Sequence, residues 1–157
     1  MTDSSSMAAV KSSMDKYIKD NIETTSGVSV HYEGLPFDDT SQTEWVAARI
    51  LDFDNTFLRQ GSDSEYAEQC NLLLQFNIYS KKSRITVSHR TYEIRDIING
   101  YFKIGKTVDL YQSGTTVIDK FKVRRILTDS SLPETNELLN YVYAVEADFT
   151  KITTNPV

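Results

Sequence analysis

A strict alternation of side chains between Glu68 and Ile78 constrains the fold of this 157-residue sequence more than any other feature. The side chains fall into two sets, one for each face of an extended segment: Glu68, Cys70, Leu72, Leu74, Phe76 and Ile78 against Gln69, Asn71, Leu73, Gln75 and Asn77. A repeat of two residues, apolar on one side and mainly polar on the other, is typical of a β-strand with one face on the core. The pattern therefore predicts a central amphipathic strand.

Helices and further strands can be placed around this strand. Apolar residues recur three and four positions apart from Met7 to Ile18, which predicts an N-terminal helix that ends near Asn21. A second helix is predicted to open at Lys81-Lys82-Ser83 and to end at Gly105. Alternating or apolar runs predict further strands over residues 28–32, 45–53, 108–111, 116–127 and 139–149, with a polar loop over 54–64 and a turn at 113–114.

The predicted order of elements is α-β-β-β-α-β-β-β. Strands joined by short loops pair antiparallel, and both helices are then free to cover one face of the sheet. We therefore expect an α+β protein, a mostly antiparallel β-sheet or sandwich with the N-terminal helix and the second helix packed on one face. The length fits one domain over residues 1–157. Residues 1–6 and 150–157 are expected to be flexible tails.

Composition and charge exclude several classes of function. The net charge of −5 argues against a dedicated nucleic-acid binder, which needs a clustered excess of Lys and Arg. The single cysteine, Cys70, excludes an intramolecular disulfide and a multi-cysteine metal site. No apolar run approaches the ~20 residues needed to cross a bilayer, and residues 1–6 show no secretory signal. A cytoplasm-like compartment and no membrane partner are therefore expected.

One short motif suggests an enzyme. Residues 52–56 (DFDNT) spell the D-x-D-x-T of haloacid-dehalogenase-type phosphohydrolases, in which the first Asp is a nucleophile, the second an acid/base, and Mg²⁺ offsets their charge. That chemistry sits at the C-terminal end of the first strand of a parallel, doubly wound sheet. Here an antiparallel strand is predicted to follow, and no adjacent Asp pair comes later near a strand end. A phosphohydrolase using Asp52 and Asp54 is a remote alternative.

Other catalytic and cofactor signals are missing from the sequence. His31 and His89 have no spacing typical of metal ligands. There is no G-x-S-x-G motif, and the glycines are too scattered for a phosphate loop. We expect no catalytic residue, no metal and no cofactor, and hence a protein that is not an enzyme.

Two segments are instead candidates for protein contacts. The run His31-Tyr32-Glu33-Gly34-Leu35-Pro36-Phe37 leads through the acidic loop 38–44 to the only tryptophan, and aromatics beside loops commonly anchor interfaces. On the predicted strand 116–127, basic residues share one face, which is either a solvated face or a docking surface for an acidic neighbour. The candidate interface residues are Tyr32, Pro36, Phe37, Asp38, Asp39, Trp45, Phe57, Lys120, Lys122 and Arg124.

The order of these segments resembles the tail terminator (tail completion) proteins of long-tailed bacteriophages. The resemblance rests on an amphipathic helix followed by H-Y-E-G-L-P-F (31–37), W-V-A-A-R-I-L (45–51), F-L-R-Q-G-S-D-S (57–64), C-N-L-L-L-Q-F-N-I-Y (70–79) and I-I-N-G-Y-F (97–102). It covers Met7 to Phe102. The sequence departs from the family in its longer acidic stretch, 38–44, and in lacking a glycine-rich segment before the central strand. In that family the position of the D-x-D-x-T match is a loop.

The resemblance implies a ring, usually hexameric, that caps the last ring of tail-tube protein, stops tube growth and presents the surface to which the filled head docks. The implied partners are other copies of the chain, the tail tube protein and head–tail connector proteins, with DNA passing through the lumen without specific binding. The implied location is the head-proximal end of the virion tail, after assembly in the host cytoplasm.

Elementary electrostatics agrees with a ring. An acidic lumen would repel DNA phosphates, and a ring needs one patch that complements a different patch on the next copy. We expect the loop aromatics and residues 38–44 of one copy to meet the basic strand of its neighbour, in an association that weakens with salt. Another head–tail connector, neck or baseplate ring protein is the alternative.

Overall fold

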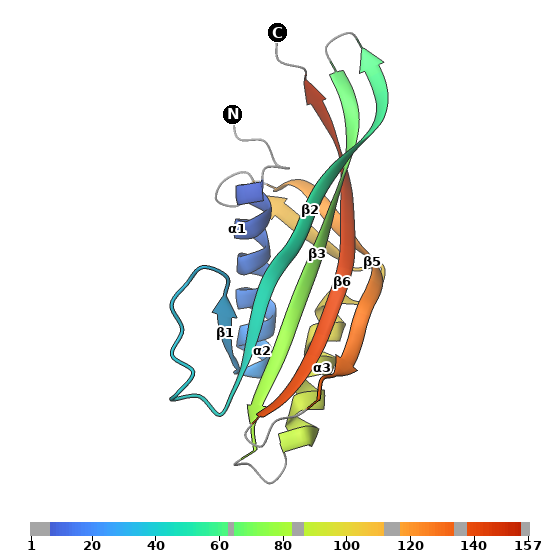
Figure 1. The fold of residues 1–157 in the computed structure, drawn as a ribbon. Coiled ribbons are helices and arrows are strands. Elements are labelled where there is room, and N and C mark those ends of the chain that lie inside the picture. Colours follow the sequence, from blue (N-terminus) through green and yellow to red (C-terminus); the bar gives the residue numbers. More distant parts are fainter. Residues whose placement is uncertain (1–6, 63–64, 83–86, 112–116, 134–137, 155–157) are drawn as a thin grey trace.

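A computed structural model describes residues 7–62, 65–82, 87–111, 117–133 and 138–154 of the chain (Figure 1). The N-terminal helical segment comprises α1 (Met7–Tyr17), a π-helical turn (Ile18–Glu23) and the short α2 (Thr24–Ser26). The remaining elements are β1 (Ser29–Tyr32), β2 (Glu44–Ser62), β3 (Glu65–Lys81), α3 (Val87–Phe102), β4 (Thr107–Tyr111), β5 (Val117–Ser131) and β6 (Leu138–Thr154). The predicted order α-β-β-β-α-β-β-β is confirmed.

The described strands form one curled sheet of six, in the order β1-β2-β3-β6-β5-β4. All neighbours pair antiparallel except β1 and β2, which are parallel from Ser29↔Trp45 to Tyr32↔Ala48. The parallel pair was not expected, and it forms because the connection over residues 33–43 carries the chain back to the level at which β1 began. A mixed α+β protein with a mostly antiparallel sheet is confirmed; a sandwich is not, since the described strands make a single sheet.

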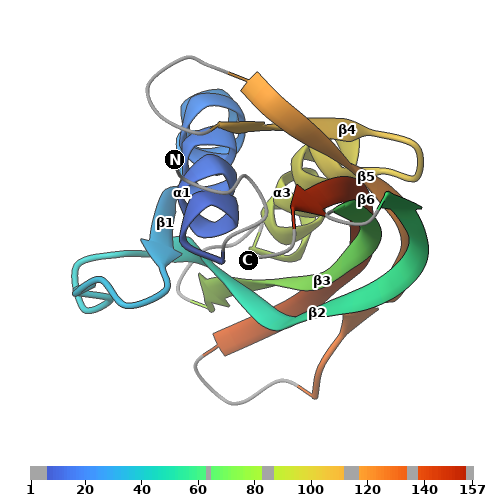
Figure 2. The same ribbon diagram turned by 90° about the horizontal axis from the view of Figure 1, so that it is seen from above.

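The core lies in the hollow of the curled sheet, where Figure 2 shows α1 and α3. Buried residues of the helical segments (Val10, Met14, Ile18, Ile22, Ile94, Ile98 and Phe102) belong to one cluster with the inner face of the sheet. The apolar face predicted for β3 is confirmed, because Cys70, Leu72, Leu74, Phe76 and Ile78 are each 1% exposed or less. Burying so many apolar side chains in one place supplies the main driving force for the fold.

The predicted boundary of the first helix is too early. The helical segment continues past Asn21 to Ser26 and stops at Gly27, whose φ of 70° is the left-handed conformation that glycine adopts without strain. The Gly27 N–H donates to the Glu23 carbonyl at 2.9 Å and closes the last turn. The extension buries Ile22, which explains why the chain stays helical past the predicted end. The second helix is described from Val87 to Phe102; of its predicted opening at 81–83, Lys81 belongs to β3, and residues 83–86 lie outside the described residues.

Three strands are longer than predicted and project beyond the helices (Figure 1). The predicted loop over 54–64 is wrong up to Ser62, because Asp54 pairs with Asn71 and Phe57 with Glu68 in the β2–β3 ladder. Strand β6 does not end at Phe149, since it pairs with β3 as far as Thr154. We call this projection the arm: residues 52–62 of β2, 65–71 of β3 and 148–154 of β6. Residues 1–6 and the predicted turn at 113–114 lie outside the described residues.

Candidate protein–protein interface

The first candidate surface is the corner loop. We use this name for residues 31–45, which comprise the end of β1, the connection 33–43 and the first two residues of β2. Tyr32 ends β1 and its hydroxyl donates to the Glu23 carboxylate at 3.3 Å. Burial of the ring, and then the Glu23 charge, raise the pKa of Tyr32. This bond fixes the start of the corner loop to the helical segment, so the loop leaves the sheet in a defined direction.

A row of rings holds the corner loop against the sheet. The His31 and Phe37 rings stack at 5.1 Å, Phe37 lies 6.3 Å from Trp45, and Trp45 stacks on Tyr79 of β3 at 5.2 Å. Trp45 is only 6% exposed, and the Lys81 ammonium lies 5.9 Å from its ring centroid. Within one chain, Trp45 therefore anchors the loop, while the neighbouring Pro36 is exposed.

Hydrogen bonds within the loop and from the Lys81 side chain hold the acidic part of the corner loop in place. The Asp38 carboxylate accepts from the Thr40 N–H at 3.0 Å and from the Thr40 hydroxyl at 2.5 Å, and these bonds hold the pKa of Asp38 below its usual value. Lys81 donates to the carbonyls of Asp39 and Thr40 at 3.0 and 3.2 Å. Asp38 and Asp39 themselves stay exposed. The loop is thus a shaped acidic surface available to another molecule.

A hollow lies between the corner loop and the outer face of the sheet. Its volume is about 630 Å³, and its lining includes Glu33, Asp39, Trp45, Arg49 and Tyr79. Aromatic and charged groups therefore share one concave surface, of the kind that receives side chains at a protein interface.

The second candidate surface is on β5. Lys120, Lys122 and Arg124 are all exposed, as predicted from the strand pattern. A register shift between Val123 and Arg125 turns the adjacent arginines outward. Arg124 pairs with Asp148 at 2.8 Å, Arg125 with Glu146 at 3.0 Å and Lys120 with Asp109 at 3.7 Å. Intrachain carboxylates thus balance part of the basic charge.

The two candidate surfaces lie apart in one chain. The corner loop flanks β1 and β2 at one edge of the sheet, whereas β5 is separated from β2 by β3 and β6. Phe57 lies in the arm, at the position opposite Glu68, so it joins neither surface. The candidate residues therefore form two separate patches.

The D-x-D-x-T residues lie in the ladder between β2 and β3. Asp52 pairs with Leu73 and Asp54 with Asn71, whose side-chain amide donates to the Asp54 carboxylate at 3.0 Å. The motif therefore runs along an antiparallel strand, and the next element is another strand. The phosphohydrolase chemistry instead requires the end of a parallel strand that is followed by a helix. This geometry gives the remote enzyme alternative no support.

A metal site in the described parts of the chain would need several His, Cys, Asp or Glu side chains placed together. No group of three or more His, Cys, Asp or Glu side chains placed to hold a metal ion is found among them. His31 stacks on Phe37, and His89 lies 3.4 Å from Glu93 on the surface of α3. No helix in the described ranges is long and apolar enough to cross a membrane.

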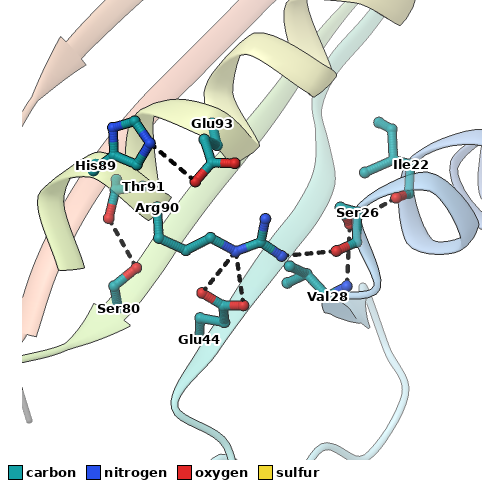
Figure 3. A network of polar contacts seen from close by, with 9 residues as sticks. All are labelled: Ile22, Ser26, Val28, Glu44, Ser80, His89, Arg90, Thr91 and Glu93. Carbon is teal, nitrogen blue, oxygen red and sulfur yellow. Dashed lines mark hydrogen bonds and ion pairs between the residues drawn. The ribbon is translucent and has the colours of Figure 1, made fainter. Parts of the chain in front are cut away.

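Sequence reasoning missed a polar junction beneath the corner loop (Figure 3). Arg90 of α3 donates to the Glu44 carboxylate at 3.1 Å and to the Ser26 carbonyl at 2.7 Å. Beside it, the hydroxyls of Ser80 and Thr91 share a buried hydrogen bond of 2.9 Å. These partners lie far apart in sequence, so no local pattern could have predicted their pairing.

A second polar junction joins α3 to β5 and β6. Arg95 donates to both oxygens of Asp129, which also accepts from the Tyr141 hydroxyl at 2.6 Å. Burial, and then the Asp129 contact, raise the pKa of Tyr141 to about 12. The junction fixes α3 to the β6–β5 part of the sheet, which β3 separates from the β1–β2 edge that carries the corner loop.

Comparison with known proteins adds no assignment to this geometry. No known protein-family model matches the chain, and no curated protein is significantly similar to it. The function therefore has to be inferred from the fold, the two surfaces and the order of the segments.

Proposed function

We propose that this chain is a tail terminator protein of a long-tailed bacteriophage. In this proposal, copies of the chain form a ring, hexameric as in the family it resembles, that caps the tail tube, stops its polymerisation and provides the head–tail joining surface. Its partners are then other copies of itself, the tail tube protein and head–tail connector proteins. Its place is the head-proximal end of the virion tail, after assembly in the host cytoplasm.

The observation that carries the proposal is the separation of two oppositely charged surfaces on one sheet. The corner loop presents Asp38 and Asp39 at the β1–β2 edge, and β5 presents Lys122 and Arg124 beyond β3 and β6. A self-complementary dimer would use one patch on both copies, whereas a ring needs two different patches that complement each other. Two separated patches of opposite charge fit the second arrangement.

The charge of the whole chain supports the same proposal. At a net charge of −5, a ring of identical copies is strongly acidic. If part of this acidic charge lines the lumen, it repels the phosphates of DNA moving through the ring. The genome could then pass the ring without specific binding.

Another connector, neck or baseplate ring protein is the alternative supported by the arm. A projecting set of strands could contact a portal-side protein as well as a tail tube (Figure 1). The two functions differ in the partner: a terminator binds the ends of assembled tubes, and a connector binds the portal side.

The native mass in solution, measured by light scattering with and without purified tube protein, tests the proposal. A ring, or a monomer that assembles only on tube ends and blocks their growth, is the expected result. A monomer that leaves tube length unchanged contradicts it. Mg²⁺-dependent hydrolysis of a phosphate ester, lost in Asp52→Asn, would instead support the enzyme alternative.

A further inference from the structure

Within the body of the protein, parts of both sheet edges are covered, although β5 beyond Val123 pairs only with β6 among the described strands. At one edge, the buried Ser13 hydroxyl accepts the backbone N–H of Tyr111 in β4 at 2.9 Å. At the other, β1 covers β2 as far as Ala48, and the Glu33 carboxylate then accepts the N–H of Ile50 at 3.2 Å. Such devices keep open edges from pairing with other chains.

The edges of the arm, in contrast, are open. From Phe53 to Ser62, β2 pairs with β3 on one side and with no other described strand on the other. The last pair between β5 and β6 is Lys122↔Asp148, so residues 149–154 of β6 likewise pair only with β3 among the described strands. Among the strands that the structure describes, the arm thus offers two edges without a neighbouring strand, one at each side.

From these edges we infer that the arms of neighbouring copies pair by backbone hydrogen bonds, β2 of one copy adding to residues 149–154 of β6 in the next. The inference rests on the proposed ring and names the contact that closes it. Both β2 and β6 run antiparallel to β3, so they run in the same direction, and side-by-side arms pair in parallel. Closure of the ring leaves no arm edge open.

Charge favours this pairing over a symmetric one. Asp54 is exposed on β2, whereas Lys122 and Arg124 are exposed where β5 parts from β6, Arg124 with Asp148 as its intrachain partner. A β2 strand docked beside β6 brings this carboxylate to basic side chains. Two β6 edges docked on each other would bring basic residues together and leave both β2 edges unpaired.

Disulfide cross-linking tests which edges meet. Asp54 and Thr150 are both exposed, and the register places them on the same face of the arm, through Asp54↔Asn71 and Asn71↔Asp148. In a Cys70→Ala background, Asp54→Cys and Thr150→Cys are purified separately with tags of different mass, then mixed and oxidised. Asp52→Cys tests a pairing register shifted by two residues. Ser130→Cys, exposed on β5 outside the arm, is the matched control.

The expected result is a several-fold excess of mixed disulfide dimers over those of either variant alone, and a ladder up to ring size in the double variant. Cross-linking of Thr150→Cys to itself at equal yield overturns the inference in favour of a symmetric contact. A ring of correct native mass without mixed dimers from either β2 position overturns the inference alone. A chain that stays monomeric with tube protein present overturns the ring and this contact together.

Discussion

Arg90 and Glu44 form an ion pair that joins α3 to the first residue of β2, with the Arg90 Nε 3.1 Å from a Glu44 oxygen. The two side chains are 24% and 14% exposed, and the same guanidinium donates to the Ser26 carbonyl at the end of the helical segment. One side chain therefore holds three elements at the base of the corner loop.

Replacing Arg90 should destabilise the protein more than its place on a helix surface suggests. Arg90→Ala removes the hydrogen bonds that Arg90 donates to the Glu44 carboxylate and the Ser26 carbonyl, at a cost of about 1–3 kcal/mol in the free energy of unfolding. Urea unfolding measures the loss. His89→Ala is the matched control, because His89 is 78% exposed and its pair with Glu93 should contribute less than about 0.5 kcal/mol. Equal losses in the two variants would contradict the role given to Arg90.

Ser13→Ala tests the blocked edge of β4. The change leaves the Tyr111 N–H without its acceptor, and we expect a loss of about 1–2 kcal/mol in the free energy of unfolding. Ser12→Ala, at the exposed neighbouring position, makes the same change in helix propensity and should not lower stability. The difference between the two variants, measured by urea unfolding, isolates the hydrogen bond. If it is zero, the hydroxyl does not protect this edge.

Acid should weaken the junction between Asp129 and Arg95. The hydrogen bond from Arg95, joined by that from Tyr141, holds the pKa of Asp129 below its usual value. A carboxyl with a lowered pKa stabilises the fold above its unfolded pKa of about 3.9, and this contribution is lost as the pH falls through the folded pKa. Asp129→Asn should therefore be less stable than the parent at pH 7, with a difference that shrinks below pH ~4.

Urea unfolding at several pH values measures that difference. Asp96→Asn is the control: its carboxylate also contacts Arg95 but is 72% exposed, so the change should matter little. A difference between the parent and Asp129→Asn that stays constant from pH 7 to acid would show that the ionised carboxylate does not stabilise the fold.

Charge reversal on β5 should weaken self-association. In the proposed ring, Lys122→Glu places a carboxylate where the neighbour presents acidic residues, and we expect association to weaken about tenfold at low salt. The effect should shrink above roughly 0.15 M salt, where charges further apart than ~8 Å are screened. Lys103→Glu changes the net charge equally at an exposed site outside β5. Equal weakening by both variants, read from native mass, would point to net charge rather than to this surface.

The sequence predicted those parts of the fold whose pattern is local. The alternation in β3 was readable because this strand lies between β2 and β6, with one face on the core along the body of the sheet. The extension of β2 to Ser62 was not readable, since most of residues 54–62 are polar and their strand conformation goes with pairing to β3. Tertiary pairing overrides weak local preference in this way.

The candidate interface was predicted with similar limits. The exposure of Lys120, Lys122 and Arg124 followed from the strand pattern. The burial of Trp45 did not, because its cover comes from Phe37 folding back across the corner loop and from Tyr79, more than thirty residues later in the chain. The edge left open at residues 149–154 depends on where β5 parts from β6, and only the three-dimensional register shows it.

The length of the strands has a mechanical consequence. A strand of 19 residues such as β2 is about 60 Å long at ~3.3 Å per residue, whereas the 16 residues of α3 span about 24 Å. The arm strands are continuous with the strands of the body, although the β2–β3 ladder shifts register between Ile50 and Asp52. Because ladder hydrogen bonds lie perpendicular to the strands, a pull along the arm loads many of them in shear at once instead of breaking them one by one. Tension applied at the tip of the arm is therefore resisted by the whole sheet.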